Sequence, residues 1–388
     1  MLHEPSGLDL FIQNNIGYIE NTLYILYPLI FMLGIIGNSV IIYVLITSLC
    51  MKRNIQLYHN NADNTNLTRN LLSPSHPNQR SAPAKFKFGP HKTLADRLRM
   101  LSARFLKEKL TVTNFYLLNL AISDFFYVLF IPFLLCTMIY EKWLFGTFLC
   151  KIYFTVAYLC QCSTVYMLVV LSVDRYLSVK YPLKVASFRS DKKARVVIVC
   201  AWLFSLVYVT PIFFATKKHH TTCNLEWPES WNFTGLHANK TSFMDYYLPP
   251  LHAFTVYTII INYLIPVSTI VILYTLILRL LRLKEKNNTL KQSKTKKKSN
   301  KRITKMVLAI IICYIMSWSP YWLLQIVQFI YQHILKKNYT LVLTVMTHLV
   351  QVVAYMSSAL NPFIYSYMSE AFRIDLKLVL TNCYLCKK

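Results

Sequence analysis

The sequence predicts an all-α membrane protein, a bundle of seven transmembrane helices followed by a short amphipathic helix. Of its 388 residues, 55% are hydrophobic, and the mean hydropathy is +0.38. Only 15% are charged, whereas soluble domains carry about 25%. The apolar residues gather in seven stretches, each long enough to cross a bilayer core, which needs about 20 residues per helix. This composition excludes an ordinary soluble enzyme.

The seven stretches divide the chain into an N-terminal segment, a membrane domain and a C-terminal segment. The polar N-terminal segment lacks the basic region and small-residue cleavage site of a removable signal peptide, so we expect span 1 to be the targeting signal. The expected spans are 23–48, 112–140, 148–176, 196–216, 254–281, 303–332 and 341–367, which gives the segments 1–22, 23–367 and 368–388.

The distribution of the charges that make up the net charge of +26 indicates the orientation of these spans. Alternate connections, counted from 48–111 onward, hold 35 of the 42 Lys and Arg residues, and the opposite ends hold 7 beside 7 acids. By the positive-inside rule the basic side is cytoplasmic, so the N-terminus is expected outside the cell and the C-terminus inside. The basic residues are spread over four loops without interleaved aromatics, which argues against a nucleic-acid partner.

Asp124 is the ionisable residue that lies deep inside an expected span, where a charge is costly and usually functional. Two interpretations stay open. The polar residues at this depth could line a hydrated cavity in which Asp124 holds Na⁺ or a proton, or they could form a hydrogen-bonded packing core between helices. No other metal and no cofactor is expected. The polar set consists of Asn38, Asn119, Asp124, Thr164, Ser357, Ser358 and Asn361.

Prolines fall inside five of the expected spans, at positions 132, 211, 266, 320 and 362. Each removes a backbone hydrogen bond and bends its helix. Pro320 lies beside Trp318 and Pro362 beside Asn361, so these two bends adjoin bulky or polar groups. The pattern favours a conformational switch over a static bundle.

A series of different short motifs follows one another along the spans. They are Gly37-Asn38-Ser39-Val40, Leu120-Ala-Ile-Ser-Asp124, Cys150, Asp174-Arg175-Tyr176, Trp202, Pro266, Tyr274, Trp318-Ser-Pro320 and Asn361-Pro-Phe-Ile-Tyr365. With this order and spacing the chain resembles the rhodopsin-like G-protein-coupled receptors over about residues 23–382, apart from one insertion. The resemblance implies a seven-helix receptor.

Within that family, local strings resemble allatostatin-C and somatostatin receptors, with opioid receptors close behind. Examples are Trp143-Leu-Phe-Gly146, Cys223-Asn-Leu-Glu-Trp-Pro228 and Trp318-Ser-Pro-Tyr-Trp322. The invertebrate allatostatin-C type fits best, because vertebrate somatostatin and opioid receptors have an Asp in span 3 where this chain has Ala157. Chemokine receptors usually add a disulfide between the N-terminus and the third outer loop, and neither segment has a cysteine here.

The resemblance also implies roles for individual residues. A disulfide would join Cys150 and Cys223. Arg175 would pair with Asp174 at rest and turn toward Tyr274 and the G protein on activation. The remaining switch residues would be Tyr176, Trp318, Pro320, Asn361, Pro362 and Tyr365. A peptide pocket between spans 3, 5, 6 and 7 would use Tyr158, Gln161, Tyr321, Gln325, Gln351 and Tyr355, with Trp318 at its floor.

The segments outside the spans contain candidate modification sites and one departure from the family pattern. Residues 369–380 read as an amphipathic helix on the inner membrane face. Cys383 and Cys386 beyond it are palmitoylation candidates, and Asn232, Asn239 and Asn338 are glycosylation candidates. The first inner loop is a handful of residues in the family, but 51–110 is long here, with a composition typical of disorder. A real insertion and a gene-model artefact both remain open.

We therefore expect a multi-pass plasma-membrane neuropeptide receptor, not an enzyme, that activates heterotrimeric G proteins, by resemblance of the inhibitory class. Its partners would be an extracellular peptide, a G protein, arrestin and membrane lipid. Three alternatives stay open: a chemokine-like or other peptide receptor, a non-signalling or orphan seven-helix receptor, and a polytopic transporter. The transporter is disfavoured because the chain shows no repeated halves.

Overall fold

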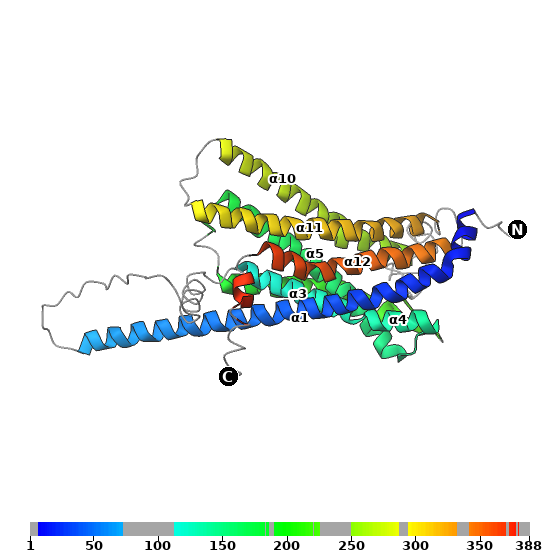
Figure 1. Ribbon diagram of the computed structural model, residues 1–388, viewed down its shortest axis with the longest axis horizontal. Coiled ribbons are helices and arrows are strands. Elements are labelled where there is room, and N and C mark those ends of the chain that lie inside the picture. Colours follow the sequence, from blue (N-terminus) through cyan, green and yellow to red (C-terminus); the bar gives the residue numbers. More distant parts are fainter. Residues whose placement is uncertain are drawn as a thin grey trace, which may run out of the picture.

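A computed structural model describes residues 7–72, 112–182, 184–185, 190–219, 221–225, 250–286, 294–331, 341–369, 372–377 and 379. Its helices form an elongated bundle, with the N-terminus at one end (Figure 1). Seven helical segments in these ranges are long and apolar enough to cross a membrane. The seven-helix prediction is therefore confirmed. The spans are Gln13–Cys50, Val112–Tyr140, Gly146–Lys180, Asp191–Ala215, Phe254–Lys284, Arg302–Phe329 and Leu341–Met368.

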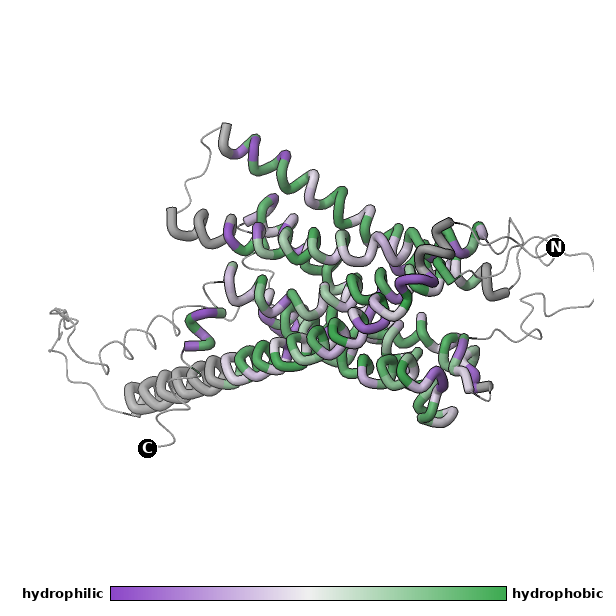
Figure 2. Tube along the Cα trace, turned by 45° about the vertical axis from the view of Figure 1, so that its right-hand side comes forward, coloured by the Kyte–Doolittle hydropathy of each residue, from purple (hydrophilic) through white to green (hydrophobic). Residues whose placement is uncertain are grey.

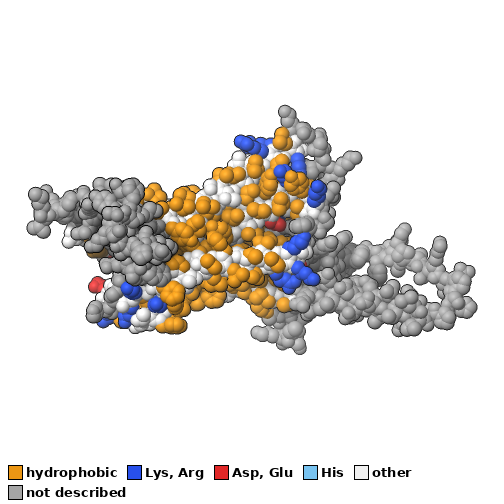
Figure 3. Space-filling view, turned by 180° about the vertical axis from the view of Figure 1, so that it is seen from behind, with side chains coloured by type: hydrophobic (Ala, Val, Ile, Leu, Met, Phe, Trp, Pro, Cys, Tyr) orange, Lys and Arg blue, Asp and Glu red, His pale blue; other side chains and the backbone are white. Residues whose placement is uncertain are grey.

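Each span corresponds to one or more helices. Hydrophobic segments run along the middle of the bundle, and apolar side chains cover the middle of its surface while charged ones lie at the two ends (Figures 2 and 3). The helices are α1 (Gly7–Leu72), α3 (Val112–Leu129), α4 (Ile131–Tyr140), α5 (Gly146–Lys180), α7 (Asp191–Ala215), α9 (Pro250–Ile259), η1 (Ile260–Leu264, a π-helical turn), α10 (Ile265–Lys286), α11 (Lys294–Phe329) and α12 (Leu341–Met368).

Helix α1 is longer than the sequence predicted. It continues past span 1 to Leu72 and extends beyond the rest of the bundle (Figure 1). The expectation of disorder is therefore wrong for 51–72. Residues 73–110, the rest of this segment, lie outside the described part of the chain. The physical reason is that no glycine or proline occurs between Gly37 and Pro74, so nothing interrupts the backbone hydrogen bonds.

The prolines act in different ways. Span 2 is broken at Phe130, which separates α3 from α4, because Pro132 in the first turn of α4 has no N–H to continue the ladder. Pro266 lies at the start of α10, directly after the π-helical turn. Three others lie inside unbroken helices, in line with the tolerance for proline where neighbouring helices support the backbone: Pro211, Pro320 and Pro362.

Helix α5 runs through the centre of the bundle and packs against α3, α7 and α10, while α1 packs against α12 and α3. Glycine allows the close approach of α1 to α12. A Cβ atom added at Gly37 would lie 2.8 Å from Cγ of Pro362, closer than real side-chain atoms approach. A Cβ added at Gly17, near the start of α1, would meet nothing within 4 Å.

We expect Gly37→Ala to destabilise the bundle by about 1–3 kcal/mol, the usual range for overpacking a tight contact. Gly17→Ala is the matched control on the same helix, and the higher helix propensity of alanine should leave its stability unchanged or slightly raised. Thermal unfolding of the two purified variants in the same detergent checks this. Equal melting temperatures would contradict the close packing of α1 on α12.

The chain forms a further helical segment after α12, over residues 372–377. Phe372 and Val379 are buried, as an amphipathic helix requires. Asp375 is buried on the same side, and its carboxylate accepts a hydrogen bond of 2.7 Å from the Ser48 hydroxyl of α1. The amphipathic segment is confirmed, but the sequence pattern did not reveal that a carboxylate lies on its inner face.

Candidate functional site

A cluster of polar side chains lies inside the bundle around Asp124, which is 1% exposed. The Ser358 hydroxyl donates to one carboxylate oxygen at 2.7 Å, and the Asn361 amide donates to the other at 2.6 Å. Asn38 joins the cluster by donating to the carbonyl oxygen of Ser358 at 3.1 Å. Spans 1, 2 and 7 are thus linked by one hydrogen-bonded network.

Of the predicted polar set, only Ser358 and Asn361 bond to Asp124 directly. Thr164 is buried but makes no hydrogen bond to the carboxylate, and Ser357 donates to its own helix at Ala354. A second set of polar contacts joins spans 2, 3 and 4. Asn119 accepts from the Trp202 indole at 3.1 Å, and the Ser123 and Ser163 hydroxyls are 3.0 Å apart. These hydrogen bonds agree with the packing interpretation, and the hydrated cavity around Asp124 stays a prediction.

The Asp124 surroundings offer oxygen atoms suited to a hard cation. Within the described residues no basic side chain pairs with Asp124, and the amide oxygen of Asn38 is buried without a hydrogen-bond partner. Carboxylate and amide oxygens are donors for Na⁺-like ions, whereas imidazole and thiolate are not favoured. In the same part of the chain, no three His, Cys, Asp or Glu side chains gather as a transition metal would need.

A cavity of about 90 Å³ lies between α5, α11 and α12, next to Trp318. It is lined by ten residues, none of them ionised: Tyr127, Tyr153, Phe154, Ala157, Tyr158, Gln161, Trp318, Tyr321, Gln351 and Tyr355. The amide nitrogen of Gln161 is buried there without a hydrogen-bond partner. In this conformation the cavity has the volume of about three waters, so it accommodates the end of one side chain and not a peptide.

Six of the seven pocket residues predicted from the sequence line this cavity, and Gln325 does not. Gln325 lies one helical turn beyond Tyr321 in α11. The prediction missed Tyr127, Tyr153 and Phe154. Helical spacing alone could have found the last two, because they lie four residues before Ala157 and Tyr158 on one face of α5. Tyr127 stacks on Tyr355 with ring centroids 4.5 Å apart, a contact that only the tertiary structure brings about.

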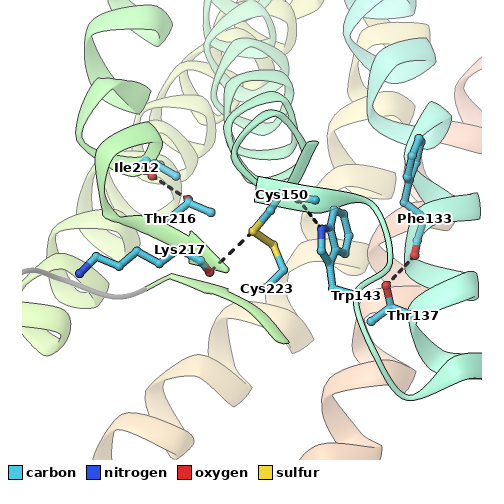
Figure 4. The surroundings of a disulfide bond; sticks show 9 residues. Phe133, Thr137, Trp143, Cys150, Ile212, Thr216, Lys217 and Cys223 are labelled. Carbon is cyan, nitrogen blue, oxygen red and sulfur yellow. Dashed lines mark hydrogen bonds between the residues drawn. A yellow bond between two sulfur atoms is a disulfide. The ribbon is translucent and has the colours of Figure 1, made fainter. Parts of the chain in front are cut away.

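A hairpin closes one end of the bundle near this cavity. Strands β1 (Thr216–His219) and β2 (Thr222–Leu225) pair antiparallel, with Lys218 opposite Cys223. Cys223 is joined to Cys150 at the start of α5, which confirms the predicted disulfide (Figure 4). The backbone N–H of Trp143 donates to the carbonyl oxygen of Thr221 at 2.7 Å, and its indole donates to Gly146. The hairpin is thereby attached to the α4–α5 connection and to α5.

The opposite end of the bundle contains Arg175, which is 3% exposed. Its guanidinium pairs with the adjacent Asp174 and donates to the Thr113 hydroxyl of α3. Removing a buried partner from such a pair leaves an uncompensated charge, which is strongly unfavourable. The Asp174–Arg175 pair therefore holds α5 against α3, and Thr113 is a partner that the sequence pattern did not indicate.

Further contacts tie the same end together. The Lys284 ammonium of α10 donates to the carbonyl oxygen of Val179 in α5, and Arg302 of α11 donates to that of Met368 at 2.8 Å. Tyr274 and Tyr365 are buried in the core, and their hydroxyls have no hydrogen-bond partner within the described residues. Tyr176 lies under the Lys180 ammonium, and these contacts join α10 to α5 and α11 to α12 at the Arg175 end. Nearer the cavity, Trp318 packs against Tyr127, Tyr314 and Tyr321.

Several predicted sites lie outside the described residues. They are the sequons at Asn232, Asn239 and Asn338 and the palmitoylation candidates Cys383 and Cys386. These modifications stay predictions.

Comparison with known proteins agrees with this arrangement. The model of the family described as "7 transmembrane receptor (rhodopsin family)" matches residues 100–365. Rat somatostatin receptor type 4 is 30% identical over 290 residues, which cover 73% of this chain and 67% of the relative. Mouse somatostatin receptor type 2 is 29% identical over 286 residues, covering 71% and 70%, and rat type 5 is 30% identical over 273 residues, covering 70% and 69%.

These relatives are signalling receptors and not enzymes, and the family spans the plasma membrane several times. The family match, the seven spans, the disulfide and the buried Asp124 network lead to one conclusion: the chain belongs to the rhodopsin family of seven-transmembrane receptors.

Proposed function

We propose that the chain is a cell-surface peptide receptor of the allatostatin-C/somatostatin type that activates heterotrimeric G proteins of the inhibitory class. The observation that carries this proposal is the placement of two sites at opposite ends of one bundle. An aromatic cavity adjoins Trp318 on the side of the disulfide-bonded hairpin, and the buried Asp174–Arg175 pair lies at the other end. The named relatives, all somatostatin receptors, support a peptide as the ligand.

The proposal includes the membrane orientation. The excess of Lys and Arg in alternate connections supports a cytoplasmic Arg175 end, with the hairpin and the N-terminus outside the cell. Arrestin and membrane lipid would then meet the Arg175 end, and the glycosylation candidates would face the exterior.

Ala157 in the cavity wall distinguishes this chain from the vertebrate somatostatin and opioid receptors it resembles. A ligand cation cannot form an ion pair there, because the lining residues are aromatic or uncharged. The cavity suits recognition by aromatic contact and by hydrogen bonds to Gln161 and Gln351.

The test is inhibition of cAMP formation, or G-protein dissociation, in cells that express the receptor at their surface. A panel of cyclic allatostatin-C-like and somatostatin-like peptides is applied, with Arg175→Ala as the inactive control. A dose-dependent response that the variant loses supports the proposal. Silence from a receptor shown to reach the surface would reject this ligand class.

The oxygen-rich surroundings of Asp124 support a Na⁺ ion as a ligand of the resting state. We expect NaCl to raise the melting temperature of the purified receptor above that in choline chloride of equal ionic strength, because a ligand bound only by the folded state stabilises it. In Asp124→Asn, which keeps the shape but removes the charge, the difference should vanish. A difference that persists in the variant would contradict a Na⁺ site at Asp124.

A further inference from the structure

A second cavity, larger than the one at the proposed ligand site, lies elsewhere in the bundle. It has a volume of about 300 Å³ and opens near the Arg175 end, between α3, α5 and the start of α7. We call it the valine groove, because half of its twelve lining residues are valines. The lining is Val112, Tyr116, Val169, Val170, Val173, Asp174, Leu177, Val185, Ser190, Lys193, Ala194 and Val197.

The walls of the valine groove are almost entirely hydrocarbon, and they continue onto the outer surface of the bundle. Val173, Leu177 and Val197 are each 38% exposed, so the groove opens sideways where the bundle meets the membrane and not only toward water. Its volume equals about ten waters, enough for a substantial part of an acyl chain. Left empty, walls of this kind would lose their dispersion contacts.

One end of the groove is polar and basic. Lys193 lines it, and Lys192 and Arg195 are exposed on the same first turns of α7, which Ser190 caps by accepting from the backbone N–H of Lys193. A helix N-terminus with nearby cations favours an anionic group. Of the two acids nearby, Asp174 has its carboxylate paired with Arg175, and Asp191 in the first turn of α7 is outnumbered by the three cations.

We propose that the valine groove binds an acidic phospholipid of the membrane, with one acyl chain between α3, α5 and α7 and the anionic headgroup at Lys193. This inference uses the orientation proposed above, which places the groove in the inner leaflet, where acidic lipids are concentrated. A phospholipid is favoured over a soluble ligand because the groove opens onto the apolar surface. Since Asp174 lines the groove, the bound lipid adjoins the carboxylate that pairs with Arg175.

The test compares two neighbouring valines of α7. Val197 lines the groove, whereas Val196 is 61% exposed and does not. Full-length receptor is reconstituted into nanodiscs of phosphatidylcholine alone or of phosphatidylcholine with phosphatidylserine, and retained lipid is counted by native mass spectrometry. We expect the wild type and Val196→Trp to retain phosphatidylserine in preference to phosphatidylcholine, and Val197→Trp to lose it.

A second pair of variants tests the two parts of the site separately. Val173→Phe fills the groove from α5 and should also remove the lipid. If both variants lose the lipid, a folding defect of one variant does not explain the loss. Lys193→Gln should lower the preference for phosphatidylserine about fivefold, the effect of one basic residue near an anionic headgroup.

The proposal is overturned if Val197→Trp retains phosphatidylserine as the wild type does, if Val196→Trp loses it equally, or if the wild type shows no preference between the two lipids. It is overturned too if Lys193→Gln keeps the full preference. Since lipid retention needs neither peptide nor G protein, these outcomes are independent of the signalling assay that tests the proposed function.

Discussion

Replacing Arg175 with alanine is expected to lower ligand-stimulated nucleotide exchange by about tenfold or more. In the proposed function this guanidinium leaves its resting partners and contacts the G protein, and a hydrogen bond to a charged group contributes about 1.5–3 kcal/mol. At rest Arg175 is buried, pairs with Asp174 and donates to Thr113, so among the described residues it is the guanidinium that lies between α3 and α5. Peptide binding at the opposite end should persist.

The measurement is exchange on a purified G protein by receptor in nanodiscs, with and without peptide. Arg195→Ala, which removes an exposed cation from the start of α7, is the matched control and should exchange as the wild type does. Thr113→Val separates the two partners of Arg175, because it leaves the pair with Asp174 and removes a contact that holds the resting state. We expect it to raise exchange without ligand. Full stimulation in Arg175→Ala would contradict the role assigned to this residue.

Removing the disulfide by the double change Cys150→Ser and Cys223→Ser is expected to destabilise the folded receptor by about 2–4 kcal/mol. The bond closes a loop of 73 residues and anchors the hairpin of β1 and β2 to the start of α5. Without it, the hairpin keeps the hydrogen bond from Trp143 to Thr221 and the packing of Leu225 in one cluster with Phe154 and Tyr158. Its position beside the cavity, which Phe154 and Tyr158 line, is then less firmly fixed.

Surface expression and the melting temperature of the purified protein measure this loss, and peptide affinity should fall with them. Cys200→Ser is the control, since Cys200 is an exposed free thiol on α7. A double variant that matched the control in both stability and affinity would show that the hairpin keeps its position through other contacts.

The spans could be predicted from the sequence, because a helix that crosses a membrane must be long and apolar and must satisfy its own backbone hydrogen bonds. These are local properties, so six of the seven expected spans agree with the structure within a few residues. Motif order was sufficient to place Asp124, Arg175 and Trp318 in their spans. The length of α1 was missed because composition was read as disorder, although no glycine or proline interrupts the helix before Pro74.

Contacts between side chains that are distant in the sequence could not be predicted in the same way. Thr113 beside Arg175, Ser48 on Asp375, and Tyr127 stacked on Tyr355 join residues from different spans, and their contacts depend on how each helix is rotated and shifted against its neighbours. Inside a membrane, the helix face that contacts lipid and the face that contacts protein carry similar apolar residues. The periodicity of the sequence therefore says little about how each helix is rotated about its axis. For this reason the sequence located the proposed ligand cavity but not all of its walls, and it gave no sign of the valine groove.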